Sequence, residues 1–236
     1  MNFENELLLI PDTQDVERDR LAQIWQEKGG DVLRIGKFWI RPETKNKRVS
    51  IYGYDSFCLV LAQVLNLELY MPKDEELAHL ATSFLKREIE LIQLQDAHQV
   101  VYPKFIKSVQ PKLFKAEVFK SFEQLKQVTS DITATELLLV SEVIQVEKEV
   151  RSFILDHKIQ DLAFYEGQGD LSSGEKFIQE FLDSTKIKLP KTFVFDIGFN
   201  QDLGWFAIEF NSSWGAGLNF CQAEKVITCI REATIN

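Results

Sequence analysis

Three oxygen-bearing side chains interrupt two otherwise apolar runs near the end of the chain. Asp196 lies in FVFDIGF, and Glu209 and Asn211 lie in WFAIEFN, which follows the turn-forming segment NQDLG. Successive side chains of a strand point to opposite faces, so Glu209 and Asn211 share one face of the return strand. If the two runs form a hairpin, the spacing of 13 residues brings Asp196 close to Glu209 across the ladder. The other face then carries seven apolar side chains: Phe193, Phe195, Ile197, Phe199, Phe206, Ile208 and Phe210.

Two neighbouring carboxylates and a carboxamide are costly to bury unless a cation accompanies them. Oxygen ligands without His or Cys suit Mg²⁺, which keeps several waters and is usually completed by substrate phosphates. The alternative is the solvated polar face of an edge hairpin, which is common in antiparallel sheets. The segment SSWGAG directly after Asn211 favours the metal site, because small residues let backbone amides approach an anionic ligand.

Bulk properties limit the classes of protein to consider. The 236 residues can form one large domain or two small ones, and 45% are hydrophobic, as in soluble globular proteins. The net charge of −9 argues against a nucleic-acid-binding surface. Cys58, Cys221 and Cys229 lack metal or redox spacing and are expected to be reduced core thiols. We find no signal peptide and no membrane-spanning run, and we therefore expect a cytoplasmic protein without membrane partners.

The first 70 residues alternate between strand and helix patterns, which predicts a parallel α/β layer. Strands are expected at 6–10, 31–35, 38–40, 49–52 and 67–70, and helices from 16 to the Gly29–Gly30 stop and over 56–65. A boundary is expected at 72–75, followed by a long helix over 76–94.

The remainder is predicted to be of mixed α/β type. Strands are expected at 100–107, 116–119 and 136–144, a hairpin at 146–156 and 159–166, and helices at 121–128, 175–184 and 222–233. The glycine-containing segment 167–174 is predicted to be a mobile loop.

The pattern of Asp196, Glu209 and Asn211 followed by SSWGAG resembles the C-terminal signature of ATP-grasp enzymes. It is most similar to a compact clade described by one conserved arginine and two lysines. This resemblance implies an α/β and α+β architecture, in which an N-terminal α/β pre-ATP-grasp domain precedes a two-subdomain ATP-grasp fold. The implied boundaries are 1–85 for the first domain and 86–236 for the second, with subdomains at 98–138 and 139–236.

The resemblance also implies roles for charged residues. Asp196, Glu209 and Asn211 would hold the Mg²⁺ ions that bridge the ATP phosphates. Lys107, in FIK, resembles a lysine of the family's "FIKP" strand, and Lys112 would be the second phosphate-binding lysine. Since Lys104 and Lys115 lie in the same segment, any one of these lysines could instead be an ordinary surface residue.

The run 139–143 resembles the linker strand between the grasping subdomains. Backbone groups of Ser141, Glu142 and Val143 would then pair with the adenine edge, with Glu142 reaching the base or the ribose. The alternative is that the run is only a core strand.

Glu149 and Arg151, in EKEVRSF, resemble the family's E-x-R strand. Arg151 would stabilise the transferring phosphate or an acyl phosphate, because its planar fork fits an oxyanion. Without the resemblance, an ion pair between neighbours on an exposed strand explains these residues equally well. Arg87 resembles an arginine that precedes the grasp. One departure is the stretch after Lys107, which lacks the usual glycines and has Ser108 in place of proline.

The resemblance implies an ATP- and Mg²⁺-dependent carboxylate–amine ligase acting through an acyl phosphate on an amino acid or a peptide. Its catalytic residues would be Arg151 and Lys107, and its partners would be a carboxylate and an amine rather than nucleic acid. Two alternatives stay open: a non-catalytic nucleotide-binding or interaction module, and a metal-dependent nuclease. The nuclease is disfavoured by Asn211, because nucleases with a similar hairpin place a lysine there.

Overall fold

The computed structural model describes residues 2–111 and 113–235, which form two compact units. Unit 1 comprises Met1–Pro72, Lys148–Ile197 and Glu209–Asn236, and unit 2 comprises Lys73–Glu147 and Gly198–Ile208. The boundaries expected from the sequence, 1–85 and 86–236, divide the chain differently and stay a prediction.

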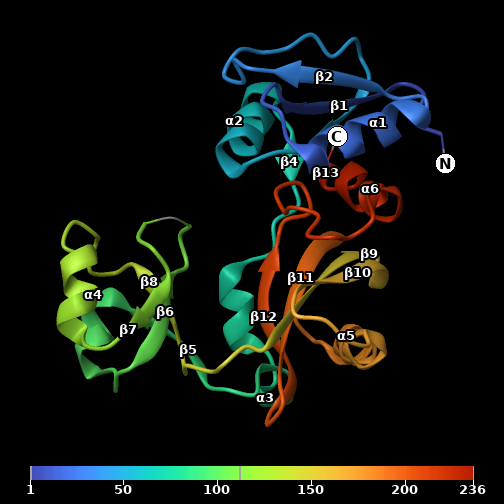
Figure 1. Ribbon diagram of the computed structural model, residues 1–236. Helices are drawn as coiled ribbons and strands as arrows, with labels where there is room; N and C mark the ends of the chain where they lie inside the picture. The colour runs from blue at the N-terminus through green and yellow to red at the C-terminus, as the bar shows by residue number, and fades with distance from the viewer. Residues whose placement is uncertain (1, 112, 236) are drawn as a thin grey trace. The chain divides into compact units, whose positions relative to one another are not determined.

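A three-stranded parallel sheet of order β2-β1-β3 forms the N-terminal part of unit 1 (Figure 1). Its elements are β1 (Glu6–Pro11), α1 (Val16–Glu27), β2 (Asp31–Ile35), β3 (Arg48–Ile51) and α2 (Asp55–Leu65). Every residue of the central strand β1 is buried, as expected of a parallel strand covered on both faces. Asp15 caps α1 by accepting a hydrogen bond from the Arg18 amide, and Asn66 ends α2 in the left-handed conformation. The predicted alternation is present from β1 to α2, whereas the strand predicted at 67–70 does not join this sheet.

Unit 1 continues with an antiparallel hairpin and the ends of two further strands. The elements are β4 (Glu68–Leu69), β9 (Lys148–Leu155), β10 (Lys158–Glu166), α5 (Ser172–Ser184), β11 (Thr192–Asn200), β12 (Gly204–Asn211), α6 (Ala223–Arg231) and β13 (Thr234–Ile235). The sheet order is β10-β9-β11-β12, and β13 pairs with β4. The rings of Phe195 and Phe210 stack with centroids 5.0 Å apart, and Phe181 from α5 packs on both. These contacts confirm the core-facing side of the hairpin near Asp196.

Contacts near the turn of this hairpin follow a different register. The rings of Phe199 and Trp205 lie 5.2 Å apart, and a Cβ added to Gly198 would lie 2.5 Å from Phe206 Cε2. Strict alternation would place Gly198 on the face opposite Phe206. The pairing must therefore shift by one residue between the turn and the Phe195–Phe210 stack, as at a β-bulge. The prediction of one continuous seven-residue apolar face is wrong for this reason.

Unit 2 is built on an antiparallel sheet of order β5-β8-β6-β7 (Figure 1). Its elements are η1 (Asp74–His79) and η2 (Leu94–Gln99), both 3₁₀ helices, with α3 (Thr82–Leu85), β5 (Ile89–Gln93), β6 (Lys104–Ser108), β7 (Glu117–Phe119), α4 (Phe122–Val128) and β8 (Leu137–Ser141). The core beneath α4 contains Leu125, Ile106 and Leu138, all fully buried.

Two expectations about secondary structure are wrong. The region 76–94 is not one helix, because Lys86 takes a left-handed conformation after α3 and β5 then pairs with β8. Pairing with a distant strand overrides the local helical preference. Residues 38–40 form a turn rather than a strand. The three cysteines are buried, as expected. Within residues 2–111 and 113–235, every helix is too short or too polar to cross a bilayer.

Candidate functional site

A buried ion pair lies at the centre of the candidate site in unit 1. Asp196 of β11 has 1% of its side chain exposed, and Arg151 of β9 approaches it with both arms of its guanidinium. Arg151 Nε donates to Asp196 Oδ1 at 2.9 Å, and Nη2 donates to Oδ2 at 2.6 Å. Nη1 donates to the Gly217 carbonyl at 2.9 Å. Arg151 therefore joins β11 to the segment that follows β12.

Asn211 connects the two carboxylates predicted to be metal ligands. Its Nδ2 donates to Asp196 Oδ2 at 2.9 Å and to Glu209 Oε1 at 3.0 Å. The structure thus brings Asp196, Glu209 and Asn211 together on one side of β11 and β12. The sequence pattern predicted this grouping, and their role as ligands stays a prediction.

Charged neighbours shift the pKa of Asp196 in both directions. Burial raises this pKa above its ordinary value, and the nearby Glu209 raises it further, whereas the hydrogen bonds and charge of Arg151 act in the opposite direction. The pKa of this buried carboxyl therefore depends on its ion pair with Arg151.

The donor types agree with Mg²⁺ rather than with a softer metal. Among the described residues, no group of three or more His, Cys, Asp or Glu side chains is arranged to hold a metal ion. Two carboxylates and a carboxamide would leave positions of a six-coordinate Mg²⁺ open to waters or phosphate oxygens.

Tyr165 of β10 is part of this cluster and was not found from the sequence. Its hydroxyl donates a short hydrogen bond to Glu149, and its ring centroid lies 5.7 Å from the guanidinium carbon of Arg151. Burial, followed by the hydrogen bond to Glu149, raises the pKa of Tyr165 well above its ordinary value. Glu149 and Arg151 thus contact the same ring, as the E-x-R pattern predicted for one face of the strand. The register of β9 and β10 shifts beside Tyr165, which is why alternation alone could not place it.

The small-residue segment after Asn211 is fixed to the N-terminal sheet of unit 1. Glu17, in the first turn of α1, accepts hydrogen bonds from the backbone amides of Leu218 at 2.7 Å and Asn219 at 3.0 Å. Tyr52 donates to the Ala216 carbonyl at 2.9 Å. The approach of amides in the SSWGAG segment, residues 212–217, to an anionic ligand stays a prediction, and the carboxylate of Glu17 binds the amides of the two residues that follow this segment.

The remaining predicted site residues lie in unit 2. Lys107 Nζ lies 3.1 Å from Asp74 Oδ2. The Ser141 hydroxyl donates to the Glu142 carbonyl at 2.9 Å, and the Glu142 carboxylate accepts from the Glu88 amide at 2.9 Å. Val143 is exposed. Lys112 lies outside the described residues, so its predicted role stays a prediction.

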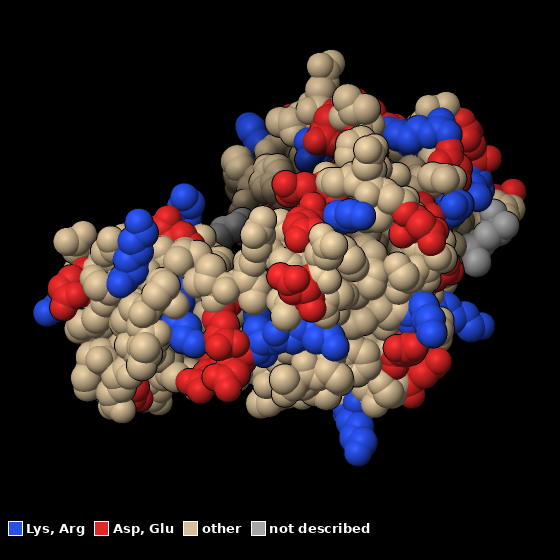
Figure 2. Space-filling model, turned by 60° about the horizontal axis from the view of Figure 1, so that its bottom comes forward, with Lys and Arg blue, Asp and Glu red and all other residues tan. Residues whose placement is uncertain are grey.

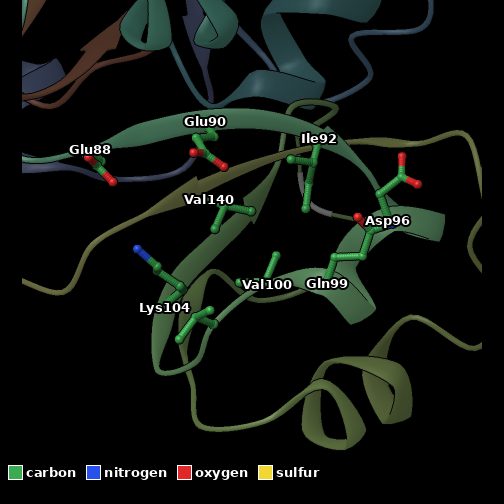
Figure 3. A pocket seen from close by; sticks show the side chains of 9 residues that line it. Glu88, Glu90, Ile92, Asp96, Gln99, Val100, Lys104 and Val140 are labelled. Atoms are coloured by element: carbon green, nitrogen blue, oxygen red, sulfur yellow. The ribbon is translucent and has the colours of Figure 1, made fainter.

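A separate cavity of about 460 Å³ opens on unit 2 (Figure 3). Its lining is Glu88, Glu90, Ile92, Asp96, Gln99, Val100, Val101, Lys104 and Val140. Lys104 lines it, whereas Lys107 points to the other face of β6, as expected for positions three apart on a strand. None of the predicted site residues lines this cavity, so we do not include it in the candidate site.

Charge is mixed over the surface that Figure 2 shows. Acidic and basic side chains are interspersed there among larger areas of other residues, and the chain has 36 acidic against 27 basic residues.

The fold is that of the ATP-grasp class. Residues 84–229 match the model of an ATP-grasp domain family, the second family of the clade named for one arginine and two lysines. This match covers more than half of the chain, so the chain belongs to that clade of ATP-grasp proteins. The predicted family and the mixed α/β fold are thereby confirmed.

Several solved structures share the fold at low sequence identity. The RimK domain protein ATP-grasp from Sphaerobacter thermophilus DSM 20745 has a TM-score of 0.65 and 14% identity over 96% of this chain and 98% of that one. D-alanine–D-alanine ligase from Bacillus anthracis, complexed with ATP, has a TM-score of 0.57 and 10% identity over 97% and 96%. The ATP-grasp ligase PsnB, complexed with a variant of its minimal precursor, Mg and ADP, has a TM-score of 0.58 and 10% identity over 98% and 97%. A search of curated proteins gives no match.

Proposed function

We propose that this protein is an ATP- and Mg²⁺-dependent carboxylate–amine ligase that acts through an acyl phosphate. The observation that carries the proposal is the buried cluster of Arg151, Asp196, Asn211 and Glu209 within a chain of the ATP-grasp family. A solvated edge hairpin does not require an almost fully buried carboxylate held by a guanidinium and an amide.

In this proposal, each residue of the cluster has a defined task. Asp196, Glu209 and Asn211 hold the metal, which supplies positive charge to the phosphoryl oxygens when bound. Arg151 keeps the carboxylate of Asp196 in place and presents a cation beside it. Lys107, which contacts Asp74 in this structure, would leave Asp74 and bind a phosphate oxygen as a compact positive charge. Ser141 to Val143 provide the edge against which adenine pairs.

Two structural neighbours that share the fold support our proposal for the substrate class. One structural neighbour is a D-alanine–D-alanine ligase, and PsnB was crystallised with a precursor. We therefore propose an amino acid or a peptide as the source of the carboxylate, with an amine as the attacking group. Neither a Ser-His-Asp nor a Cys-His signature is found in the sequence, which agrees with chemistry that needs no protein nucleophile.

ADP release tests the proposal directly. Purified protein is incubated with Mg²⁺, ATP and pools of amino acids and short peptides, and ADP is measured against protein-free and Mg²⁺-free controls. We expect ADP release that requires both Mg²⁺ and one of the pools. Folded protein that releases no ADP with any pool counts against catalysis.

A non-catalytic nucleotide-binding module is the second candidate. It is favoured because hydrogen bonds within the protein already occupy groups that would bind phosphate. Arg151 donates to Asp196 and Gly217, and the amides of residues 218–219 donate to Glu17. A ligand that binds only the folded state stabilises it by about 2.7 kcal/mol at a hundredfold excess over Kd. A rise in Tm with Mg²⁺-ATP but without ADP release identifies the module, and no rise removes both ATP-dependent functions.

The nuclease is the least favoured candidate, because Asn211 donates its amide to both carboxylates where an ammonium would be needed to activate water. Incubation with plasmid DNA and Mg²⁺ tests it. We further propose a cytoplasmic location, where ATP and Mg²⁺ are abundant, and fractionation of cells that express the protein tests this.

A further inference from the structure

Arg87 is a buried cation held by neutral groups of unit 2. Its Nη1 donates to the carbonyls of Leu85 at 2.9 Å and Ala207 at 2.8 Å, and its Nε donates to Ser141 Oγ at 3.0 Å. The guanidinium carbon lies 5.6 Å from the ring centroid of Phe206. Within the part of the chain that the structure describes, no carboxylate forms a salt bridge with it. Burial accordingly lowers the pKa of Arg87 to about 10.

A buried cation without a carboxylate partner is costly unless its N–H groups find acceptors, and neutral acceptors take this place around Arg87. Three N–H groups of one rigid fork reach three separate segments: the end of α3, the end of β8 and the middle of β12. Lysine could not reproduce this, because it presents a single nitrogen. Arg87 therefore fixes where β8 ends relative to its neighbours in unit 2.

The end of β8 is where Ser141 passes into Glu142 and Val143. The Ser141 hydroxyl accepts from Arg87 and donates to the Glu142 carbonyl, so its donor and one acceptor position are already used. Glu142 is also held, because its amide donates to the Glu88 carbonyl and its carboxylate accepts from the Glu88 amide. Base recognition by this segment therefore falls to the backbone of Val143, whose position depends on the two residues before it.

We propose that Arg87 is a positioning residue for base selection: by fixing Ser141 and Glu142, it sets the backbone edge that distinguishes adenine from guanine. Adenine and guanine present opposite donor and acceptor patterns to such an edge, so a displaced edge loses discrimination before it loses phosphate binding. The inference rests on the proposed nucleotide-binding function and concerns unit 2 alone.

The test compares wild type, Arg87→Met and Arg87→Lys, with Arg41→Met as the matched control. Arg41 is an exposed arginine that donates to the Val64 carbonyl in unit 1. Calorimetry gives Kd for ATP, GTP and inorganic tripolyphosphate, each with Mg²⁺, and a melting curve without ligand gives Tm. We expect the preference for ATP over GTP to fall about tenfold in Arg87→Met, as for loss of a charge-assisted hydrogen-bond network. Tripolyphosphate affinity should stay within about twofold, Arg87→Lys should be intermediate, and Arg41→Met should match wild type.

Other outcomes overturn the inference in distinguishable ways. If Arg87→Met lowers Tm but leaves the ratio of the Kd values for ATP and GTP unchanged, Arg87 is only structural. An equal loss of affinity for ATP, GTP and tripolyphosphate has the same meaning. Wild type that binds ATP and GTP equally overturns base selection but not ligase function. Wild type that binds no nucleotide overturns both. If Arg87→Met does not fold, Ser141→Ala removes one acceptor of the same network and must reduce the ratio in the same direction.

Discussion

Arg151 and Asp196 form a two-point ion pair across neighbouring strands β9 and β11, with nitrogen–oxygen distances of 2.9 and 2.6 Å. Burial and the charge of Glu209 raise the pKa of Asp196, and the hydrogen bonds and charge of Arg151 act against that rise. The proposed metal chemistry needs an ionised Asp196 carboxylate, which Arg151 favours.

The substitution Asp196→Asn tests two roles of this ion pair: its contribution to the stability of the fold and its contribution to ADP release. Arg151 would lose its charge partner in a buried position, so we expect the free energy of unfolding to fall by about 3 kcal/mol. Mg²⁺-dependent ADP release should fall by roughly 100-fold or more. Asp202→Asn, at the exposed turn of the same hairpin, is the control and should change neither quantity. Full ADP release by a folded Asp196→Asn protein would contradict the metal assignment.

Lys107→Met should weaken Mg²⁺-ATP binding by about tenfold, the loss expected for one charge-assisted contact. The paired control is Lys115→Met, since the Lys115 side chain is 84% exposed and lies 3.5 Å from Glu117. Equilibrium titration with a fluorescent ATP analogue measures both variants. Equal losses in the two would show that general positive charge, rather than a defined contact of Lys107, attracts the nucleotide.

Gly198→Ala should destabilise the hairpin near its turn. A Cβ at this position would lie 2.5 Å from Cε2 and 2.7 Å from Cζ of Phe206, so the ring must move. We expect the free energy of unfolding to fall by about 1–3 kcal/mol, as in other overpacked cores. Gly215→Ala is the comparison, because the nearest atom to its added Cβ is 3.4 Å away, an ordinary contact. Urea denaturation of both variants measures the difference, and equal stabilities would refute the register shift that places Phe206 against Gly198.

Acid stability should depend on Glu232. Although burial acts to raise it, the hydrogen bond from Lys191 and the charges of Arg48, Lys191 and Arg231 hold the pKa of Glu232 below its ordinary value of 4.5. A lowered carboxyl pKa stabilises the fold above pH 4.5, and that stabilisation is lost as pH falls through the lowered value.

Glu232→Gln should therefore be less stable than wild type near neutral pH, with the two curves converging in acid. Urea denaturation at several values between about pH 3 and pH 6 measures this. Glu68→Gln, an exposed glutamate on β4, is the control. Parallel curves for Glu232→Gln and wild type over this range would contradict the expectation.

The elements that local pattern predicts well are those whose periodicity and end signals agree. The helix from Val16 has apolar side chains at helical spacing and a glycine stop, and it forms as expected, with Asp15 as the cap that the structure shows. The hairpin that carries Asp196 was found because turn residues separate two strongly apolar runs. By contrast, β5 was taken for part of a helix, because its strand character comes from pairing with β8, a contact invisible in a local window.

In the candidate site too, the sequence predicts the residues that are close along the chain and does not predict those that contact distant segments. Asp196, Glu209 and Asn211 were found because a short spacing determines their proximity. Tyr165, Glu17 and Arg87 were missed or given no defined role, since each acts on a segment distant in sequence: Tyr165 across a shifted register, Glu17 on residues 218–219, and Arg87 on Ser141 and Ala207. Their partners lie far away along the chain, and a local sequence window does not show such contacts.

The offset pairing of β11 and β12 restricts how this hairpin can change length. Deleting one residue between Phe206 and Glu209 would give a regular ladder, yet it would move the side chains at one end of the strand to the opposite face of the sheet. Either Phe206 would leave Gly198, or Glu209 would leave the side that Asp196 occupies. Insertions at the tip, residues 201–203, would not change these faces. We therefore expect homologous chains to vary in length at the tip and to keep the length between Phe206 and Glu209.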